Sequence, residues 1–550
     1  MTPIGLAELA GAHLDLERAP FTLPSSRILV FRGNGGVRVH TAEYERQVAQ
    51  CRVIDLLAVR DAADRPLPVT SVLPHAIRFG ADVTLTFAGP HALSVGGPAG
   101  TRVEWTAPDG TAGRRTLDAA ALRLEVGDDR SVRAVASERH DADLAATMTV
   151  WDDWFARCPR VRHGLQEMTA FCWWVLGANI VTLPSLGDAR AVAPSKIGYV
   201  GLWQWDAYFI ATGLRHGDPA LAREQLELAF RFATRSGQLP DVVHDGGTLA
   251  SSDDLPESDR QHLLRDGSAV ADPDTPIPLT KPPLAAWALR KVLEVERADE
   301  WARAQLAIIR RSQDWWFATQ DADGDGMPEY RHPYSSGLDD SPVFDHGAPT
   351  ASPDLGAYLV LQDRELARFA RELGGFGAHA HEARAQRTLK RLLAMWDGRA
   401  FRASVAGRAT PDDAIVGLLP LLTGALPDGV ARLLVDAMRD PARYGTPWGL
   451  PTVAASDPAF SAERMWRGPV WVNTNTLVAE GLARSGLAAE ARALEERTVE
   501  LVLHGGGPHE YFAPDTGQKP PGATTSFGWS AALFVDLAVR LSRERPAATA

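Results

Sequence analysis

Residues 218–237 read DPALAREQLELAFRFATRSG, and the helical pattern of this stretch decides the fold of most of the chain. Asp218 is typical of a helix N-cap, and Pro219 suits the first turn, where its missing N–H is not needed. Gly237 is expected to end the helix. The apolar positions recur at helical spacing: Leu221, Leu226, Phe230 and Phe232. The stretch therefore predicts an amphipathic helix that buries one face.

Similar apolar stripes continue through the chain, in residues 161–178, 203–215, 285–297, 302–318, 353–374, 382–397, 411–423, 428–439, 473–485, 488–503 and 529–543. About a dozen helices in about 390 residues leave longer loops than a tight bundle needs. Loops of this kind carry function. We therefore expect a mainly α fold, in which six helical hairpins form an (α/α)6 toroid over residues 161–545, with a linker helix at 141–160 and a disordered tail at 546–550.

The N-terminal part has a different texture. Short runs rich in Val, Ile and Thr, such as RILVFR, GVRVH, DVTLTF and RVEWT, are separated by turn sequences such as Asn34-Gly35 and Asp109-Gly110. Many short strands at close spacing are typical of a sandwich. We expect a β-sandwich-like domain in residues 1–140.

Composition excludes several classes of protein. The chain has 57 basic and 69 acidic residues, a net charge of −12, and carries no basic run, which argues against nucleic acid. The most apolar stretch, 171–183, is shorter than the ~20 residues that span a bilayer, so no membrane association is expected. We see no signal peptide, and Cys51, Cys158 and Cys172 are too few for a disulfide framework, so a reducing, cytoplasmic location is expected.

Five loop segments combine Trp, Gly, Pro and polar residues where the helical periodicity breaks. They are GLWQWDAYF (201–209), TKPPLAAW (280–287), DADGDGMPEYRHPYSSGLDDSP (321–342), RMWRGPVWVNTN (464–475) and HEYFAPDTG (509–517), the last followed by FGWSAA (527–532). The chain also has 16 Trp residues. Most of these rings are explained by helix packing, and some suit a cleft for a ligand with flat apolar faces, such as a sugar.

These segments, taken in order over residues 201–532, resemble glycoside hydrolase family 63, which includes α-glucosidases and mannosylglycerate or glucosylglycerate hydrolases and is more distantly similar to trehalases. The matching family patterns are WxWDxxF, QPP, DxDGDGxPEY leading into ESGLDNSP, YWRGPxWxNxNY, and EYxxPxTG followed by FxWSAA. The resemblance implies a toroid that hydrolyses a small carbohydrate substrate without an organic cofactor. It does not extend to residues 1–140.

Hydrolysis with inversion needs a carboxylic acid that protonates the leaving oxygen and a carboxylate that activates water on the opposite face of the sugar. The resemblance places the acid at Asp339 and the base at Glu510. In an inverting enzyme the two carboxyl groups should lie about 6.5–9.5 Å apart. Asp340, next to Asp339, is the alternative acid.

The resemblance also implies a subsite for the cleaved sugar. Its candidate residues are Trp203, Trp205, Asp206, Phe209, Lys281, Gly337, Trp466, Arg467, Trp471, Tyr511 and Trp529. Each has a structural alternative: core packing for the tryptophans, a helix cap for Asp206 and a salt bridge for Arg467. Asn473 is as good a helix cap as a ligand contact.

The chain departs from the family pattern at two places. Ser335 and Asp340 replace the Glu and Asn of the ESGLDN segment, and Lys281 replaces the Gln of QPP. These changes bear on the identity of the substrate more than on the reaction.

Asp321, Asp323 and Asp325 have the spacing of a calcium loop, although His332 stands where an EF-hand has its twelfth-position Glu. A tight turn capped by aspartates is the preferred interpretation. No metal is therefore expected in the site, with a structural calcium as the alternative.

The sequence thus predicts an inverting exo-α-glycosidase acting on an α-linked glucoside or mannoside, with a trehalase-like or glycosylglycerate hydrolase as the first alternative. A phosphorylase, lyase or epimerase on the same toroid, or a non-catalytic sugar-binding protein, is the further alternative. A phosphorylase would dispense with the base, and a binding protein would be expected to lack one of the two carboxylates.

Overall fold

The computed structural model describes residues 2–44, 46–118, 120–248 and 279–543. Its contacts divide the chain into two compact units, which are described separately below. Unit 1 comprises residues 1–201, 524–531 and 538–550, and unit 2 comprises residues 202–523 and 532–537. The tail expected at 546–550 lies outside the described residues. Within them, no helix is long and apolar enough to cross a membrane.

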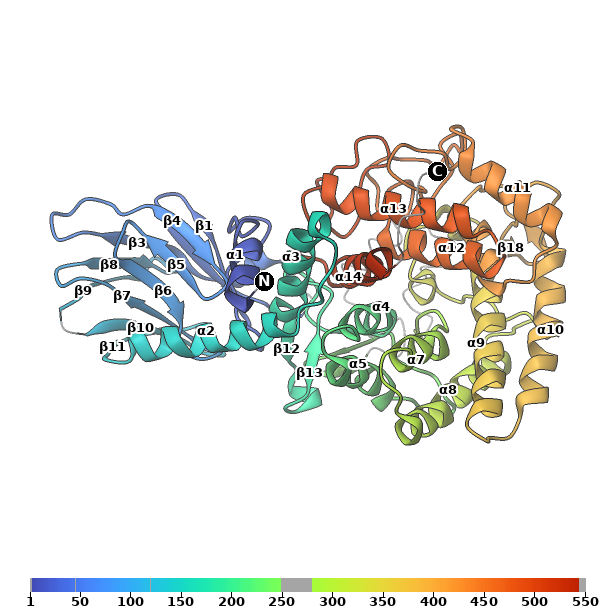
Figure 1. The fold of residues 1–550 in the computed structure, drawn as a ribbon, viewed down its shortest axis with the longest axis horizontal. Coiled ribbons are helices and arrows are strands. Elements are labelled where there is room, and N and C mark those ends of the chain that lie inside the picture. Colours follow the sequence, from blue (N-terminus) through green and yellow to red (C-terminus); the bar gives the residue numbers. More distant parts are fainter. Residues whose placement is uncertain (1, 45, 119, 249–278, 544–550) are drawn as a thin grey trace. The chain divides into compact units, whose positions relative to one another are not determined.

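Unit 1 contains two antiparallel sheets (Figure 1). The five-stranded sheet has the order β1 (Ile28–Gly33), β2 (Gly36–Thr41), β3 (Arg52–Arg60), β8 (Arg102–Thr106), β9 (Ala112–Thr116). The six-stranded sheet has the order β11 (Val132–Ser137), β10 (Ala121–Val126), β7 (Ala92–Gly96), β6 (Val83–Phe87), β5 (Ala76–Phe79), β4 (Val69–Leu73). The Asn34-Gly35 turn is confirmed: it joins β1 to β2, and Gly35 takes φ +83°.

Three helices complete the main elements of unit 1: α1 (Pro3–Gly11), α2 (His140–Ala156) and α3 (His163–Ala178). The imidazole of His140, at the start of α2, lies between two sheet hydroxyls, with Nε2 2.7 Å from Thr84 Oγ1 and Nδ1 2.9 Å from Ser94 Oγ. At the other end, the ring of Trp154 stacks on Trp173 of α3, with centroids 4.9 Å apart. Both ends of α2 are thus attached to neighbouring elements of its unit. A short hairpin, β12 (Ile180–Thr182) and β13 (Arg190–Val192), follows α3.

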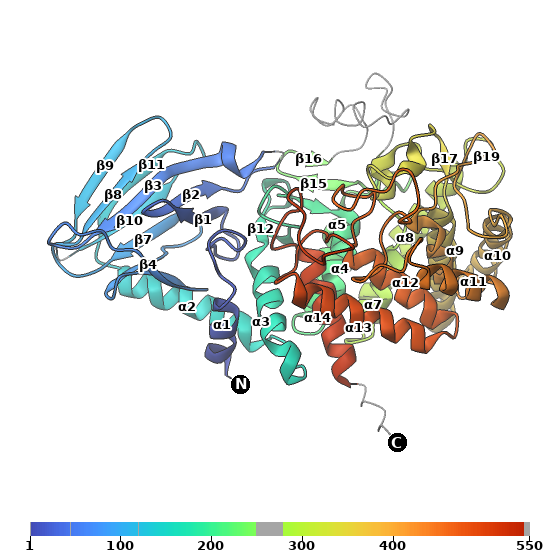
Figure 2. The same cartoon turned by 90° about the horizontal axis from the view of Figure 1, so that it is seen from above.

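Unit 2 is built from helices joined by long loops (Figures 1 and 2). They are α4 (Gln204–Leu214), α5 (Pro219–Arg231), α7 (Ala285–Leu293), α8 (Asp299–Thr319), α9 (Pro353–Glu372), α10 (Ala378–Ala394), α11 (Asp428–Arg439), α12 (Val472–Arg484) and α13 (Ala488–His504). The last helix, α14 (Gly528–Arg543), contributes residues to both units. All eleven residues of α4 are buried, whereas α5 and α10 bury only one face. Almost fully buried and amphipathic helices therefore alternate from α4 to α10, and the buried turns η6 and η7 stand between the amphipathic helices α10 and α11.

The end of one predicted helix and the whole of another differ clearly from the sequence prediction. Asp218 caps α5 as predicted, accepting a hydrogen bond from the backbone N–H of Leu221 at 3.0 Å. The helix ends at Arg231, however, because residues 234–238 close a separate turn in which Gly237 takes φ +106°. The helix expected at 411–423 is instead two short 3₁₀ turns, η6 (Ile415–Gly417) and η7 (Leu419–Thr423). Pro420 removes a backbone donor inside that stretch, which disfavours a continuous α-helix.

Short sheets and turns shape the loops of unit 2. One sheet joins β14 (Leu202–Trp203), β15 (Val242–His244) and β16 (Gly247–Thr248), and another joins β17 (Thr350–Ala351), β18 (Ser404–Val405) and β19 (Arg408–Ala409). The 3₁₀ turns η4 (Pro333–Ser336) and η5 (Pro342–Phe344) flank the GLDD segment. Of the predicted site residues, Trp203 lies in β14, and Gly337 and Asp339 lie between η4 and η5.

Candidate active site

The β14–β15 pairing places the WQWD segment next to Asp241. Trp203 is the partner of Val242 in the register of the two strands, and the backbone N–H of Gln204 donates to the carbonyl of Asp241 at 2.8 Å. Asp206 then falls in the first turn of α4 and is buried. Its alternative role as a helix cap is wrong, because the N-cap residue is Trp203.

The Gln204 side chain joins this segment to the KPP segment. Its Oε1 accepts hydrogen bonds from Thr280 Oγ1 at 3.2 Å and from the backbone N–H of Lys281 at 3.3 Å. The Lys281 ammonium donates to the carbonyl of Tyr334 at 2.6 Å and lies 3.2 Å from Asp241 Oδ1. It also lies 3.7 Å from Asp339 Oδ1, so a single cation contacts two carboxylates.

Burial changes the titration of these groups. It raises the pKa of Asp241 to about 6, against the opposing effect of Lys281. Burial alone would lower the pKa of Lys281, but the carboxylates of Asp241 and Asp339 outweigh it, so the pKa is raised and the ammonium stays charged. The pKa of Asp206 is well above its ordinary value because of burial, and the charges of Asp241 and Glu510 add to this effect. The charge of Glu510 thus acts on the carboxyl group of Asp206.

Asp339 and Asp340 have different surroundings. The Asp340 carboxylate accepts the backbone N–H of Trp466 at 2.9 Å and lies 3.2 Å from Arg464 Nε, with its side chain 7% exposed. The Asp339 side chain is 29% exposed and contacts Lys281. Asp340 thus serves to hold the 464–467 segment, whereas Asp339 keeps part of its surface open to solvent.

The segment that holds Glu510 is fixed against the RGPVW segment. The backbone groups of Val470 and Phe512 exchange two hydrogen bonds, of 2.7 and 3.0 Å. The ring of Tyr511 packs beside Trp471, with centroids 4.9 Å apart. Glu510 is 2% exposed in the structure. This pairing explains how a carboxylate that is 171 residues after Asp339 in the sequence joins the cluster.

Two of the candidate sugar-facing rings pack on each other. Trp466 and Trp471 are stacked with centroids 3.6 Å apart and an interplanar angle of 6°, and both are 1% exposed. The indole N–H of Trp471 donates to the carbonyl of Met465 at 2.8 Å. Trp205 is also buried and lies in contact distance of Phe209, whereas Trp203 is half-buried. Trp203 is therefore the tryptophan of this group with the most accessible surface.

The Arg467 guanidinium donates two hydrogen bonds to the Asp345 carboxylate, of 2.8 and 2.6 Å. The fork of a guanidinium matches the two oxygens of a carboxylate, so this pair fixes the loop after the GLDD segment. Asn475 bonds the backbone of Leu450 from both ends of its amide. Asn473 is not the cap of α12, since the N-cap is Trp471. Its amide is fully buried and has no hydrogen-bond partner among the described residues.

Gly337 leaves room for a ring, which gives a first testable prediction. It takes φ +70°, and a Cβ there would lie 2.5 Å from the Trp205 ring. Gly337→Ala should therefore lower stability by about 1–3 kcal/mol and, by moving Asp339, lower kcat/KM at least tenfold. Thermal unfolding and kinetics measure both. Gly429→Ala, in α11 with open space around it, is the matched control and should leave kcat/KM unchanged and raise stability by up to about 1 kcal/mol. If Gly337→Ala and Gly429→Ala have the same stability and the same kcat/KM, Gly337 does not position Asp339.

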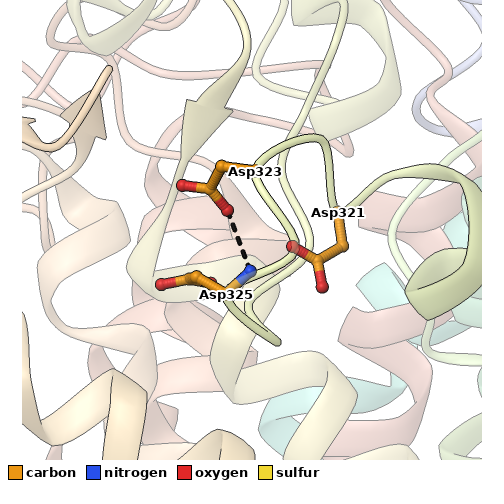
Figure 3. A group of neighbouring side chains, drawn as sticks. All are labelled: Asp321, Asp323 and Asp325. Carbon is orange, nitrogen blue, oxygen red and sulfur yellow. Dashed lines mark hydrogen bonds between the residues drawn. The ribbon is translucent and has the colours of Figure 1, made fainter.

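Asp321, Asp323 and Asp325 gather in one loop, with oxygens within 4.8 Å of one another (Figure 3). Each uses one oxygen to accept a backbone N–H of the loop, from Gly326, Asp325 and Met327 respectively. Arg391 lies 3.1 Å from the other oxygen of Asp325. Calcium needs six to eight oxygen ligands, and this donor set fits a capped turn better.

Chelation tests this interpretation of the loop. We expect excess EDTA to leave both the unfolding temperature and the activity unchanged, because the backbone N–H groups and Arg391 already compensate the aspartates. A ligand that binds the folded state raises the unfolding temperature with its concentration. A rise of several degrees on adding Ca²⁺ to the chelated protein would therefore show a calcium site.

One candidate, Trp529, falls in unit 1 and the other candidates fall in unit 2. The sequence reasoning did not find Asp241 or Asp345. The signal for Asp241 was its place after Pro240 in an irregular segment between two helices. Asp345 follows the SP motif by three residues and offered no distinctive pattern.

Comparison with known proteins identifies the family of the chain. Residues 199–530 match the family described as "Mannosylglycerate hydrolase MGH1-like glycoside hydrolase domain". The mannosylglycerate hydrolase of Thermus thermophilus is 31% identical over 399 residues, covering 60% of this chain and 92% of that protein. The glucosylglycerate hydrolase of Mycolicibacterium hassiacum is 25% identical over 443 residues, covering 64% and 94%.

A solved structure is similar as well. The GH63 mannosylglycerate hydrolase from Thermus thermophilus in complex with Tris and D-glycerate superposes with a TM-score of 0.56 at 26% identity, covering 66% of this chain and 98% of that chain. The protein is therefore a glycoside hydrolase. It belongs to the mannosylglycerate hydrolase MGH1-like family, within glycoside hydrolase family 63.

Proposed function

We propose that this enzyme hydrolyses the α-glycosidic bond of a small glycoside with inversion, using Asp339 as the general acid and Glu510 as the general base. The observation that carries the proposal is the cluster in unit 2, where Asp339 contacts Lys281 and the charge of Glu510 bears on Asp206. Two carboxylates in one cluster are what inverting hydrolysis requires, provided that a water molecule fits between the base and the sugar.

The proposed steps follow from these positions. Asp339 gives its proton to the glycosidic oxygen as the bond to the anomeric carbon breaks. Glu510 takes a proton from water, which attacks the opposite face of the sugar. Asp206 is proposed to hydrogen-bond hydroxyls of the cleaved sugar, since a buried carboxyl group needs a polar partner. Trp203 is proposed to pack on that sugar. The other aromatic candidates of unit 2 and Arg467 are proposed to shape the subsite around them.

The fold proposed for the catalytic part is the (α/α)6 toroid. It is supported by the alternation of almost fully buried helices, such as α4 and α9, with amphipathic ones, such as α5 and α10. In a double ring of helices the inner helices are covered on all sides, and the outer helices expose one face. The loops described above would then meet at one end of the ring.

For the substrate, we propose an α-mannoside or α-glucoside of glycerate, because relatives with those two activities match most of the catalytic part. The test is a screen of purified protein against mannosylglycerate, glucosylglycerate, kojibiose, nigerose, maltose, isomaltose and trehalose, read by the free sugar released. Proton NMR of the first product shows its anomeric configuration. Release of the β-anomer supports inversion, and release of the α-anomer overturns it.

A further inference from the structure

Lys281 is the residue of the cluster whose chemistry the proposed reaction does not yet use. It stands where the family pattern has glutamine, so a charged ammonium replaces a neutral amide. Its side chain is 6% exposed, and its Nζ has three oxygen neighbours: Tyr334 O at 2.6 Å, Asp241 Oδ1 at 3.2 Å and Asp339 Oδ1 at 3.7 Å. The contact with the Tyr334 carbonyl is a hydrogen bond, and the two carboxylates lie close enough for the charge of the ammonium to act on both.

We propose that Lys281, positioned by Asp241, tunes the acid strength of Asp339 by stabilising the carboxylate that remains after proton donation. The inference rests on the proposed function, since it takes Asp339 as the acid. The ammonium is too far from Asp339 for a strong hydrogen bond, and it acts through its charge. Lys281 and Asp241 are thus positioning residues, which act through Asp339 rather than on the sugar.

The balance of the step shows why such a charge helps. The Asp339 proton passes to the glycosidic oxygen, and the electrons of the breaking C–O bond stay on that oxygen. Asp339 thereby becomes an anion 3.7 Å from Lys281, and the new pair is attractive. Lys281 keeps its own proton, because the neighbouring carboxylates hold its pKa above the ordinary value. The effect is greatest for a poor leaving group, such as the alkoxide of glycerate, which depends most on proton transfer.

Asp241 has the opposite influence on the acid. Above pH 6 its carboxylate is ionised, so it shares the ammonium with Asp339 and adds a negative charge to the cluster. The sharing is mutual, since Asp339 contributes to the raised pKa of Asp241. Removing the charge of Asp241 should make Asp339 a stronger acid, and removing the charge of Lys281 should make it a weaker one.

Other titratable groups surround this pair and do not carry the effect. His332 has its pKa lowered to about 3 by burial and by Lys281, so it is neutral in the working range. Asp340 is held by Arg464 and by the backbone of Trp466. Asp206, in α4, has a pKa well above its ordinary value, and Glu510, after α13, adds to that shift. Lys281 also acts to lower the pKa values of Asp206 and His332, so Lys281→Gln shifts these two groups as well. A loss of activity confined to the substrate with the poor leaving group identifies the effect on Asp339.

The experiment compares the pH dependence of kcat/KM in the wild type, Lys281→Gln, Lys281→Arg and Asp241→Asn, with the glycoside that the wild type hydrolyses best. We expect the alkaline limb of the kcat/KM profile to move to higher pH, by about one to three pH units, in Lys281→Gln. It should move down in Asp241→Asn and stay close to the wild type in Lys281→Arg. At a pH where wild-type Asp339 is protonated, Lys281→Gln should lose at least tenfold in kcat on that glycoside and less than threefold on the α-glycosyl fluoride.

Structural disorder in the site would lower the activity of both variants, but it would not shift the alkaline limbs of Lys281→Gln and Asp241→Asn in opposite directions. If the alkaline limbs of the two variants do not move, or move in the same direction, the inference about Lys281 is wrong, whereas the proposed function is unaffected. A wild type without activity on any glycoside of the screen overturns the proposed function instead. If Lys281→Gln fails to fold, as judged by circular dichroism, the downward shift in Asp241→Asn and the retained limb in Lys281→Arg decide the question.

Discussion

Asp339→Asn is expected to lower kcat/KM on a glycoside with a poor leaving group by about 10²–10⁴-fold, the usual contribution of a general acid. The activity on an α-glycosyl fluoride should fall far less, because fluoride leaves with little protonation. The side chain of Asp339 is part-exposed and contacts Lys281, so an amide of the same shape should fit without unfolding the loop. Steady-state kinetics with the two substrates, side by side, measure this dependence on the leaving group.

Asp340→Asn is the matched control for this prediction. Asp340 is the neighbouring carboxylate, and its hydrogen bond to the backbone of Trp466 and its ion pair with Arg464 are structural. The substitution should lower the unfolding temperature and affect both substrates alike. A loss of less than about tenfold in Asp339→Asn on the natural substrate would show that Asp339 is not the acid, and Asp340 would be mutated next. A leaving-group dependence in Asp206→Asn would mean that the residue assignments are out of register.

The helices were readable from the sequence because their evidence is local. Asp218 and Pro219 indicate the start of α5, and the apolar stripe after them predicts its buried face. The end of α5 was missed because Gly237 is a turn residue in either case, and the turn at 234–238 competes with the helix for the same backbone groups. The stretch 411–423 has helical spacing, but Pro420 lacks a backbone donor, and Gly424, in the left-handed region, ends the second of the two 3₁₀ turns that form instead.

The site could be predicted only in part from the sequence, because it brings together segments that are far apart along the chain. The motifs around Asp339 and Glu510 were visible in the sequence, as was the substitution at Lys281. Its partner Asp241 was not, because their contact depends on the pairing of β14 with β15 and on the Gln204 side chain. The stacking of Trp466 on Trp471 was equally hidden, since the spacing of two rings in a loop does not say which surfaces they bury.

Glu510→Gln is expected to lower turnover by about 10²–10⁴-fold on both the natural glycoside and the α-glycosyl fluoride, because every substrate needs an activated water. This equal loss distinguishes a base from an acid. Glu510 is buried, and the backbone next to it is held by the Val470–Phe512 hydrogen bonds. The amide group in Glu510→Gln should therefore occupy the place of the carboxylate. Azide is a nucleophile that needs no base, and it should restore part of the turnover with the fluoride.

The product of the azide reaction gives the sharpest readout. Attack on the face opposite to the leaving group should yield the β-glycosyl azide, detectable by NMR. An α-glycosyl azide would indicate two displacements and a retaining enzyme in which Glu510 is the acid/base. The anomer that the wild type releases from the natural glycoside distinguishes a base from a nucleophile at Glu510. Glu480→Gln is the matched control: Glu480 is also buried in unit 2, but it is paired with Lys291 and accepts from Trp287. That variant should lose stability and show no rescue by azide, because its carboxylate holds helices together rather than a water molecule.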